Sequence, residues 1–488
     1  MPSCLPRPIA VEALAEGLPS VPLRPSLSLL QTLRLGLFQA CLGCLAVIFA
    51  GLLNRVMLTE LGFPGLLVGT SLAFEQFVAP SRVLFGQISD AHPLARRHRV
   101  PYVLLGTALF CGIAVIAVPI IFRVGQVLQQ GSPGAIALAV LALGALFAGY
   151  GLAISLATTP YLALVIDRTS EEERSRAVGV IWCMLTVGIV VGAILISLSL
   201  SSLDGIRDPR LLEPTLSAFM AKVAIGVMGL TVIATWGMES PADSLGLSQE
   251  GGREDGVTLR QAWTLIRSSS QVLIFFSFLI LFTLALFLQD PVLESYGAQV
   301  FGMPIAATAQ LNAFWGVGTL VGLLVAGLWI VPWLGKLATA RLGCQLIALS
   351  LLLLLLSGIT ANVPTLQLVM VLFGLAAGIG TNGALCLMLD LTLPEVAGTF
   401  VGVWGLAQAL SRAVGKVIGG GLLDLGNLLS ASGLLPRSVG SYPAFALVLG
   451  IELLVAIAAL LMLQRVNVRQ FRHDTGQSLA KVLTAEWS

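Results

Sequence analysis

The sequence predicts an all-α polytopic membrane protein with twelve transmembrane helices in two six-helix bundles. Hydrophobic residues make up 57% of the 488 residues and charged residues 11%, a charged share about half that of an average soluble domain. Apolar stretches of about twenty residues recur along the chain, and this is the length at which a helix crosses a bilayer. One polar segment divides these stretches into two sets of six, and the two sets are related by sequence.

The apolar stretches give the order of the elements. The proline-rich segment 1–32 is predicted to be a tail rather than a signal peptide. The N-terminal bundle, 33–238, contains spans at 33–58, 65–88, 101–123, 135–164, 178–200 and 217–238. A polar linker follows at 239–269. The C-terminal bundle, 270–464, contains spans at 270–289, 307–331, 337–360, 364–389, 397–422 and 442–464, and a second tail occupies 465–488.

Basic residues indicate which side of the membrane each connection faces. They gather in the connections after the second, fourth, sixth and eighth spans and after the last span, in groups such as Arg96, Arg97 and Arg99. Because positively charged connections stay in the cytoplasm, the even-numbered connections, the linker and both tails are predicted to be cytoplasmic.

The two halves resemble each other around their fourth and fifth spans. The stretch LVIDRTSEEERSRAVGVIWCMLTVGIVVG starts at Leu164 and aligns without a gap with LMLDLTLPEVAGTFVGVWGLAQALSRAVG, which starts at Leu387. The alignment pairs Asp167 with Asp390, at the predicted cytoplasmic ends of the fourth and tenth spans. Six-span repeats joined by a cytoplasmic linker are typical of proteins whose halves pack around a central cavity. The chain therefore resembles the major facilitator superfamily, and the resemblance implies the major facilitator fold.

A loop motif supports this resemblance. Major facilitator proteins carry a Gly, an Asp four residues later and a basic cluster between the second and third spans. Here GQISDAHPLARR supplies Gly86, Asp90 and the arginine pair at 96–97. An ordinary positively charged loop would account for the arginines but not for the Gly–Asp spacing. The resemblance implies that Asp90 latches the cytoplasmic ends of neighbouring helices through charge pairs, and it makes Asp167 and Asp390 further candidate gating residues.

Longer strings indicate a narrower resemblance. The segments FQACLGCLAVIFAGLLNRVMLTELGFP (38–64), FVAPSRVLFGQISD (77–90), RRHRVPYVLLGT (96–107) and QDPVLESYGAQVFGMPIAATAQLNAFWGVGTLVG (289–322) are similar to the bacteriochlorophyll delivery (PucC/LhaA-type) family of that superfamily. One departure is LESYG, where the family usually has LEPYG. The resemblance implies a photosynthetic-membrane protein that helps assemble light-harvesting or photosystem complexes by handing chlorophyll or bacteriochlorophyll to their apoproteins.

Polar side chains inside the spans are the candidate pigment- or substrate-binding residues, because a charge in a bilayer costs about 3 kcal/mol or more unless it is paired or faces a wet cavity. The candidates are Asn54, Arg55, Glu75, Arg82, Gln289, Asp290, Glu294 and Asn312. Glu75 and Arg82, in the second span, lie two turns apart on one helix face. The alternative to a binding role is that these two side chains pair with each other and serve only the structure. Arg412 and Lys416 lie one turn apart and repel each other, so at least one needs an acidic partner, for which Asp424 and Glu452 are candidates.

Asp290 and Glu294 lie four residues apart, so they form one acidic face on any helix that continues through them. The simplest interpretation is a polar helix end in water. In the twelve-span order this face lies at the non-cytoplasmic end of the seventh span, across from Asn54 and Arg55 at the same end of the first span. The hypothesis is that the acidic face and Arg55 meet across the bundle interface. They would close the cavity on that side or offer an oxygen ligand to a pigment magnesium.

Histidines are absent from the predicted spans. His92, His98 and His473 all fall in connections or the tail, where they could not ligate a pigment inside the bilayer. No intrinsic cofactor is expected. A transiently held chlorophyll or bacteriochlorophyll would meet its magnesium with water or with oxygen ligands from Glu, Asp, Asn or Gln, which suit a hard cation.

Two functions of different class stay open. The first is an assembly factor in a thylakoid or intracytoplasmic membrane, whose partners are a chlorophyll-type pigment, light-harvesting or photosystem apoproteins and membrane lipid. The second is a proton-coupled secondary transporter of a small polar or lipid substrate, with Glu75 or Asp290 as the titrating carboxylate. An enzyme is not expected, because the sequence shows no phosphate-binding glycine loop, metal-ligand cluster or Ser/His/Asp set. A net charge of +2 gives no signal for nucleic acid.

Overall fold

The computed structural model describes residues 28–169, 171–200, 209–239, 270–390, 397–434 and 440–467. Within these residues the chain is almost entirely helical, and nine helices are long and apolar enough to cross a membrane. Helices are the expected solution, because a backbone inside hydrocarbon must satisfy its own hydrogen bonds. The prediction of an all-α polytopic membrane protein is confirmed.

The N-terminal half begins at a capped helix. Ser28 Oγ accepts a hydrogen bond from Gln31 N at 3.3 Å, and Gln31 Oε1 accepts one from Ser28 N at 3.0 Å, so the two residues form a capping box. The first span that follows is α1 (Leu29–Leu45), η2 (Ala46–Leu52), α2 (Leu53–Arg55) and η3 (Val56–Glu60), where η2 and η3 are π-helices. The remaining helices of this half are α3 (Gly65–Phe77), α4 (Ser81–Ala91), α5 (Val100–Gln130), α6 (Pro133–Arg168), α7 (Glu171–Leu200) and α8 (Pro209–Thr235).

The C-terminal half contains a short helix between its first two long ones. Its elements are α11 (Ser270–Phe287), α12 (Leu293–Phe301), α13 (Ile305–Val325), η5 (Ala326–Ile330), α14 (Val331–Leu334), α15 (Lys336–Thr360), α16 (Val363–Asp390), α17 (Ala397–Ala431) and α18 (Tyr442–Gln464). α12 ends at Gly302, whose φ of +66° is a left-handed conformation that glycine adopts without strain.

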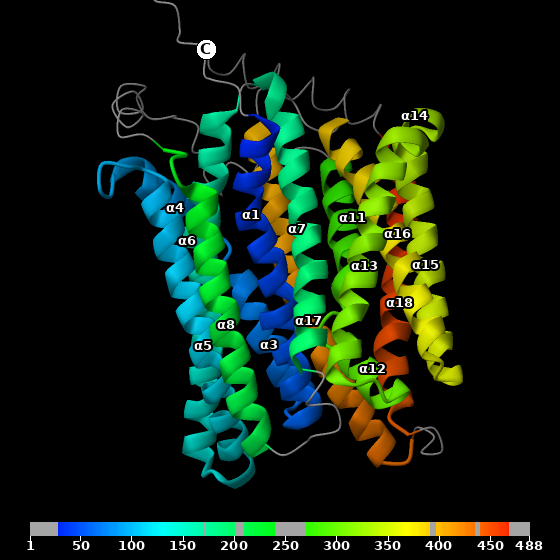
Figure 1. Ribbon diagram of the computed structural model, residues 1–488. Coiled ribbons are helices and arrows are strands. Elements are labelled where there is room, and N and C mark those ends of the chain that lie inside the picture. The colour runs from blue at the N-terminus through cyan, green and yellow to red at the C-terminus, as the bar shows by residue number, and fades with distance from the viewer. Residues whose placement is uncertain are drawn as a thin grey trace, which may run out of the picture.

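Figure 1 shows the two halves as two groups of upright helices side by side. They meet chiefly where α3 packs on α17 and where α7 packs on α13. Glycines allow the closest approaches: a Cβ at Gly420 in α17 would overlap the carbonyl oxygen of Gly65 at the start of α3, and a Cβ at Gly188 in α7 would overlap that of Ala40 in α1. Small residues at helix contacts are the usual means of close packing in membranes.

The twelve-span count stays a prediction, because three of the twelve predicted spans are not among the nine long apolar helices of the described residues. Residues 65–88 form two helices, α3 and α4, with a turn that ends at Pro80; a proline lacks the N–H that would continue the helix. The spans predicted at 270–289 and 397–422 correspond to α11 and to α17, which carries Arg412 and Lys416. The predicted linker lies outside the described residues except for Glu239.

The two ends of the molecule differ in the helices and connections that they contain. The α12 end contains α12, the end of η3 and the start of α3, and it lies at the bottom of Figure 1. The Arg99 end contains the connection from α4 to α5 and the end of α6, at the top of the same view. The distribution of basic residues predicts that the Arg99 end faces the cytoplasm.

Candidate functional site

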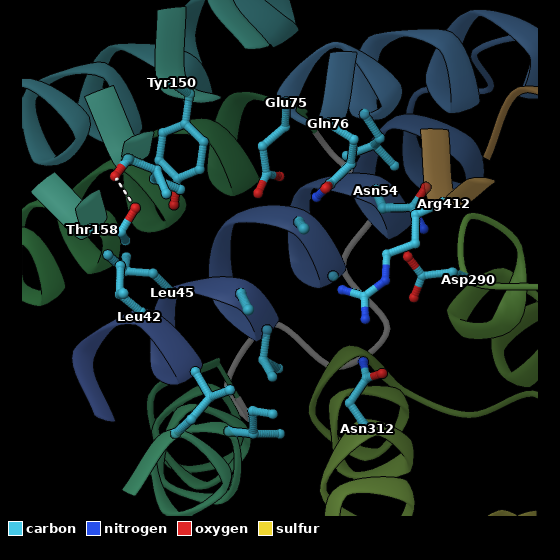
Figure 2. A pocket seen from close by; sticks show the side chains of 18 of the residues that line it. Leu42, Leu45, Asn54, Glu75, Gln76, Tyr150, Thr158, Asp290, Asn312 and Arg412 are labelled. Carbon is cyan, nitrogen blue, oxygen red and sulfur yellow. Dashed lines mark hydrogen bonds between the residues drawn. The ribbon is translucent and has the colours of Figure 1, made fainter. Parts of the chain in front are cut away.

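A cavity of about 680 Å³ lies between the two halves, within the range of roughly 300–1,000 Å³ usual for small-molecule sites. Both halves contribute to its wall, and Figure 2 shows side chains from each pointing into the same space. One part of the wall is apolar and comes mainly from the first span and α7, as Leu42, Leu45, Val47, Trp182, Leu185 and Ile189. The cavity therefore presents both an apolar and a charged surface to a ligand.

The charged part of the wall carries three carboxylates and three cations: Glu75, Asp290, Glu294, Arg82, Arg412 and Lys416. Lys416 Nζ lies 3.5 Å from Asp290 Oδ2. The acidic partner of Lys416 is thus Asp290, and the sequence-based candidates Asp424 and Glu452 were wrong for it. Six of the eight predicted binding residues line this cavity, namely Asn54, Glu75, Arg82, Asp290, Glu294 and Asn312.

Arg412 enters the cavity from α17. Its Cζ lies 4.2 Å from the centre of the Phe287 ring, a cation–π contact. Its guanidinium points toward Asp290 and lies near Asn312 in Figure 2. It also interacts electrostatically with Glu75 and with the like charge of Arg82. Arg412 therefore interacts with charged side chains of both halves.

Hydrogen bonds between the halves gather at the α12 end, where Asn54 and Arg55 meet the segment 289–304. Asn54 Nδ2 donates to Pro291 O at 2.8 Å. Arg55 donates to Met303 O at 3.1 Å and to the hydroxyl of Thr308. Arg55 also forms an ion pair with Glu60 on its own span at 3.5 Å, with both side chains 6% exposed. Arg55 therefore contacts the C-terminal half through the carbonyl oxygen of Met303 and the hydroxyl of Thr308 in α13, whereas its ion pair with the acidic face stays a prediction.

Three further contacts join the halves at this end. Thr59 Oγ1 donates to Ser295 Oγ at 3.0 Å, and Gln310 Nε2 donates to Ser197 Oγ at 3.3 Å. Asp424 in α17 accepts hydrogen bonds from Gly65 N at 2.6 Å and from Leu66 N at 2.8 Å. A carboxylate at a helix N-terminus satisfies orphan donors and opposes the helix dipole. Asp424 therefore caps α3 from the other half.

Glu294, in α12, lies outside the spanning helices and is only 3% exposed. Its Oε1 accepts a hydrogen bond from Asn312 Nδ2 at 2.7 Å. A Cβ at Gly51 in η2 would clash with the same oxygen, so any other residue there would force this carboxyl to shift. Burial raises the pKa of Glu294 to about 8, and Asp290 adds to the rise, while Arg55 and the Asn312 hydrogen bond oppose it. The side chain can therefore exchange a proton near neutral pH.

Gln289 does not line the cavity, although the sequence made it a candidate. Gln289 is 4% exposed, and its amide donates to Leu286 O at 3.3 Å. Its backbone N–H donates to Glu452 Oε1, also at 3.3 Å. Glu452 thus supports the break between α11 and α12.

At the Arg99 end, one arginine joins two of the predicted gating residues. Arg99 forms an ion pair with Asp90 in α4, and its Nε lies 3.1 Å from Asp167 Oδ2 in α6. Glu239 accepts hydrogen bonds from the N–H groups of His98, Arg99 and Val100, at 2.5, 3.0 and 2.8 Å, and so caps α5. All of these elements belong to the N-terminal half. The side chain of Asp390 lies outside the described residues.

Sequence reasoning missed several members of both sites. Gln39, Tyr150, Trp182 and Trp315 line the cavity, but nothing in their sequence context separates them from side chains that face lipid. Glu239 begins a polar stretch and gives no local sign that it caps α5. Among the described residues no cluster of three or more His, Cys, Asp or Glu could hold a metal ion.

Comparison with solved structures identifies the class of protein. The nucleoside transporter NupG superposes with a TM-score of 0.64 at 14% identity, covering 88% of this chain and 99% of NupG. A bacterial homolog of the human lysosomal transporter Spinster, inward-facing and unoccupied, gives 0.63 at 15% identity, covering 91% and 96%. These likenesses concern the fold alone. The molecule is a polytopic helical membrane protein with the major facilitator fold.

Comparison of sequences identifies the family. The family described as PUCC protein matches residues 52–471. Protein PucC of Rhodovulum sulfidophilum is 31% identical over 415 residues, covering 85% of this chain and 87% of that protein. This chain belongs to the PucC family.

Two relatives from Rhodobacter capsulatus carry different names. An uncharacterized protein in the puhA-bchM intergenic region is 31% identical over 422 residues, covering 84% of this chain and 83% of its own. A protein named bacteriochlorophyll synthase 44.5 kDa chain is 30% identical over 460 residues, covering 90% and 95%. The resemblance noted in the sequence strings is therefore confirmed over most of the chain.

Proposed function

We propose that this protein is a photosynthetic-membrane assembly factor that delivers chlorophyll or bacteriochlorophyll to light-harvesting or photosystem apoproteins. The observation that carries the proposal is the cavity of about 680 Å³ between the halves in a chain of the PucC family. The names of its relatives include PucC and a bacteriochlorophyll synthase chain. The proposed location is a thylakoid or intracytoplasmic membrane, with both termini in the cytoplasm and with apoproteins and lipid as partners.

The geometry of the cavity supports a ligand that is amphipathic. A chlorophyll-type pigment combines a flat apolar macrocycle with polar groups at its rim and a metal at its centre. The apolar wall from the first span and α7 suits the macrocycle faces, and the charged wall suits the rim. Among the described residues, the halves are joined by hydrogen bonds at the α12 end, while the Arg99 network joins helices of one half. This asymmetry suits a carrier that loads from the Arg99 end.

The proposal includes no catalytic step. The relative named bacteriochlorophyll synthase 44.5 kDa chain belongs to the same family. An assay of this protein directly tests whether it forms esterified pigment. Purified protein incubated with bacteriochlorophyllide and an isoprenyl diphosphate is expected to form no esterified pigment. Formation of ester in proportion to added protein would contradict the proposal.

A proton-coupled transporter is the second candidate, and one observation favours it. Glu294 borders the cavity and has a pKa raised by burial to about 8, as a proton-exchanging carboxylate requires. The sequence suggested Glu75 or Asp290 as the titrating carboxylate. Both line the cavity, and Asp290 is paired with Lys416 at 3.5 Å. The likeness to solved transporters is below 25% identity and concerns the fold alone, so this candidate has the weaker support.

A complementation experiment tests the proposed function. A photosynthetic bacterium deleted for its own PucC-family gene would express this protein at a level followed by immunoblot. The expected result is recovery of the near-infrared absorbance of its antenna complexes, with chlorophyll-type pigment co-purifying with the tagged protein. Normal abundance in the membrane with neither recovery nor bound pigment would overturn the proposal.

A further inference from the structure

Arg412 brings a positive charge into the middle of the cavity. Its Cζ lies over the Phe287 ring, 4.2 Å from the ring centre, and Figure 2 shows the guanidinium reaching into the open space. A contact of this kind attracts the charge of the guanidinium but satisfies none of its N–H donors with a hydrogen bond. The donors of Arg412 are therefore left for another partner.

The two terminal nitrogens of Arg412 are accessible. Of the guanidinium nitrogens, only Nε is both enclosed by protein and without a hydrogen bond. Nη1 and Nη2 also form no hydrogen bond or ion pair within the part of the chain that the structure describes, so they keep accessible surface. Because Arg412 lines the cavity, a ligand there can reach them.

The other cations of the cavity wall have acidic neighbours of their own. Lys416 Nζ lies 3.5 Å from Asp290 Oδ2, and Arg82 interacts electrostatically with Glu75. Both carboxylates also attract Arg412, but neither forms an ion pair with it. Arg412 is thus the cation of the wall that lacks an acidic partner of its own.

The remaining carboxyl group of the wall does not offset this charge at neutral pH. Burial raises the pKa of Glu294 to about 8, so the group is mostly protonated at pH 7. Of the three carboxylates and three cations of the wall, two carboxylates and three cations then remain. One excess positive charge matches a ligand with a single negative charge, and the two carboxylates disfavour a more highly charged anion such as phosphate.

The apolar wall indicates the rest of the ligand. Leu45, Trp182 and Ile189 line the same cavity. A small inorganic anion would leave these side chains in contact with water, whereas an amphipathic molecule would cover them. A guanidinium can bind a carboxylate through two parallel hydrogen bonds. The cavity therefore fits an amphipathic molecule with one free carboxylate.

We propose that Arg412 binds the free carboxylate of an amphipathic acid held in the cavity. This inference rests on the proposed function and names the form of the pigment that the cavity holds. The propionate side chain of the pigment is a free acid in bacteriochlorophyllide and an ester in bacteriochlorophyll, and the ester has no charge to offer Arg412. A membrane fatty acid carries the same group, and the test separates these two sources.

The test compares acids with their own methyl esters. Purified protein in phosphatidylcholine nanodiscs would be titrated with bacteriochlorophyllide a and its methyl ester, which share the ring and the magnesium, and with oleate and methyl oleate. Wild type should bind bacteriochlorophyllide a at least about tenfold more tightly than its ester, a ratio that corresponds to about 1.4 kcal/mol. Arg412→Gln should bind both equally, at the wild-type affinity for the ester.

Arg341 in α15 provides a matched control. Its Nε is likewise enclosed without a hydrogen bond, and the residue is likewise half-buried, but it is not part of the cavity wall described here. Arg341→Gln should keep the full preference for the acid. Unchanged binding of the methyl ester by Arg412→Gln shows that this variant is folded, which separates carboxylate binding from stability.

Two outcomes would overturn the inference. If wild type binds neither acid more tightly than its ester, no cation of the cavity holds a carboxylate. A preference that survives in Arg412→Gln would mean that another side chain holds it. Antenna assembly that is restored despite either result would leave the proposed function standing. Oleate bound through Arg412, with no pigment bound and no antenna restored, would support the carboxylate site and overturn the proposed function.

Discussion

Raising the pH should open the α12 end through Glu294. Its pKa rises from an ordinary value of 4.5 to about 8 because the carboxyl is buried, so the closed arrangement prefers the protonated form. The stabilisation from this group is fully present below about pH 4.5 and is lost as pH rises through about 8. At 1.36 kcal/mol per pH unit, the shift corresponds to roughly 5 kcal/mol. This exceeds the gap of a few kcal/mol that commonly separates two conformations.

Other charges near this carboxyl act in known directions. Arg55 favours its ionised form and Asp290 opposes it. Glu294→Gln, which mimics the protonated side chain, should hold the α12 end closed at every pH.

Spin-label distances can follow this opening. Labels at Gln129→Cys, the second-last residue of α5, and Thr365→Cys, near the start of α16, lie on opposite halves at the α12 end and are exposed. In a background without native cysteines, the distance between them should lengthen from about pH 6 to about pH 9.5. The same pair combined with Glu294→Gln should not change. An unchanged distance in the otherwise native protein, or an equal lengthening in the Gln variant, would refute the reasoning.

Three further substitutions test the geometry. Gly51→Ala should lower the free energy of unfolding by about 1–3 kcal/mol, seen as a lower thermal unfolding midpoint, because its Cβ would collide with a hydrogen-bonded carboxyl oxygen. Gly112→Ala, whose Cβ would meet nothing within 4 Å, should not lower it; equal midpoints would show that η2 adjusts freely. Arg99→Gln should leave the protein inserted but change cysteine labelling at the Arg99 end, whereas Arg96→Gln, from the exposed part of the connection, should not; identical labelling patterns would contradict the latch. Asp424→Asn should lower stability by about 1 kcal/mol as a weakened cap, measured by denaturation in detergent, and an unchanged midpoint would show that the cap carries no net stability.

The apolar pattern of the sequence was sufficient to predict the long helices but not every point at which a helix ends. The apolar stretches predicted each described helix of substantial length, because bilayer thickness fixes how many apolar residues a span needs. The same reasoning joined 65–88 into one span, although Pro80 lies within it. A proline inside an apolar stretch can either bend or end a helix, and the neighbouring helices decide which occurs. η2 and η3 left no sign in the sequence for the same reason.

The polar residues of the predicted spans located the cavity, but the sequence could not predict which of its charged side chains form ion pairs with each other. Asn54 and Asp290 were predicted because polar groups in apolar spans are costly outside a wet site. The partner of Lys416 was expected in its own or the following span, whereas it lies in the segment after α11. Arg99, rather than Arg96 or its neighbour, forms the ion pairs with Asp90 and Asp167. Such choices depend on the three-dimensional approach of helices distant in sequence.

The π-helical stretch η2, Ala46–Leu52, also sets the rotational phase of the first span. A π-turn holds one residue more than an α-turn, so deleting one residue there could restore a regular helix without breaking the span. Side chains before and after such a deletion would keep nearly the same relative direction, because the removed residue is the one that the wider turn accommodates. A residue inserted into the regular α-helical part of the span would instead turn every side chain beyond it by about 100°, and Asn54 would leave the cavity wall while the span stayed apolar. The π-helical stretch is thus the part of the first span in which a change of length by one residue disturbs the site least.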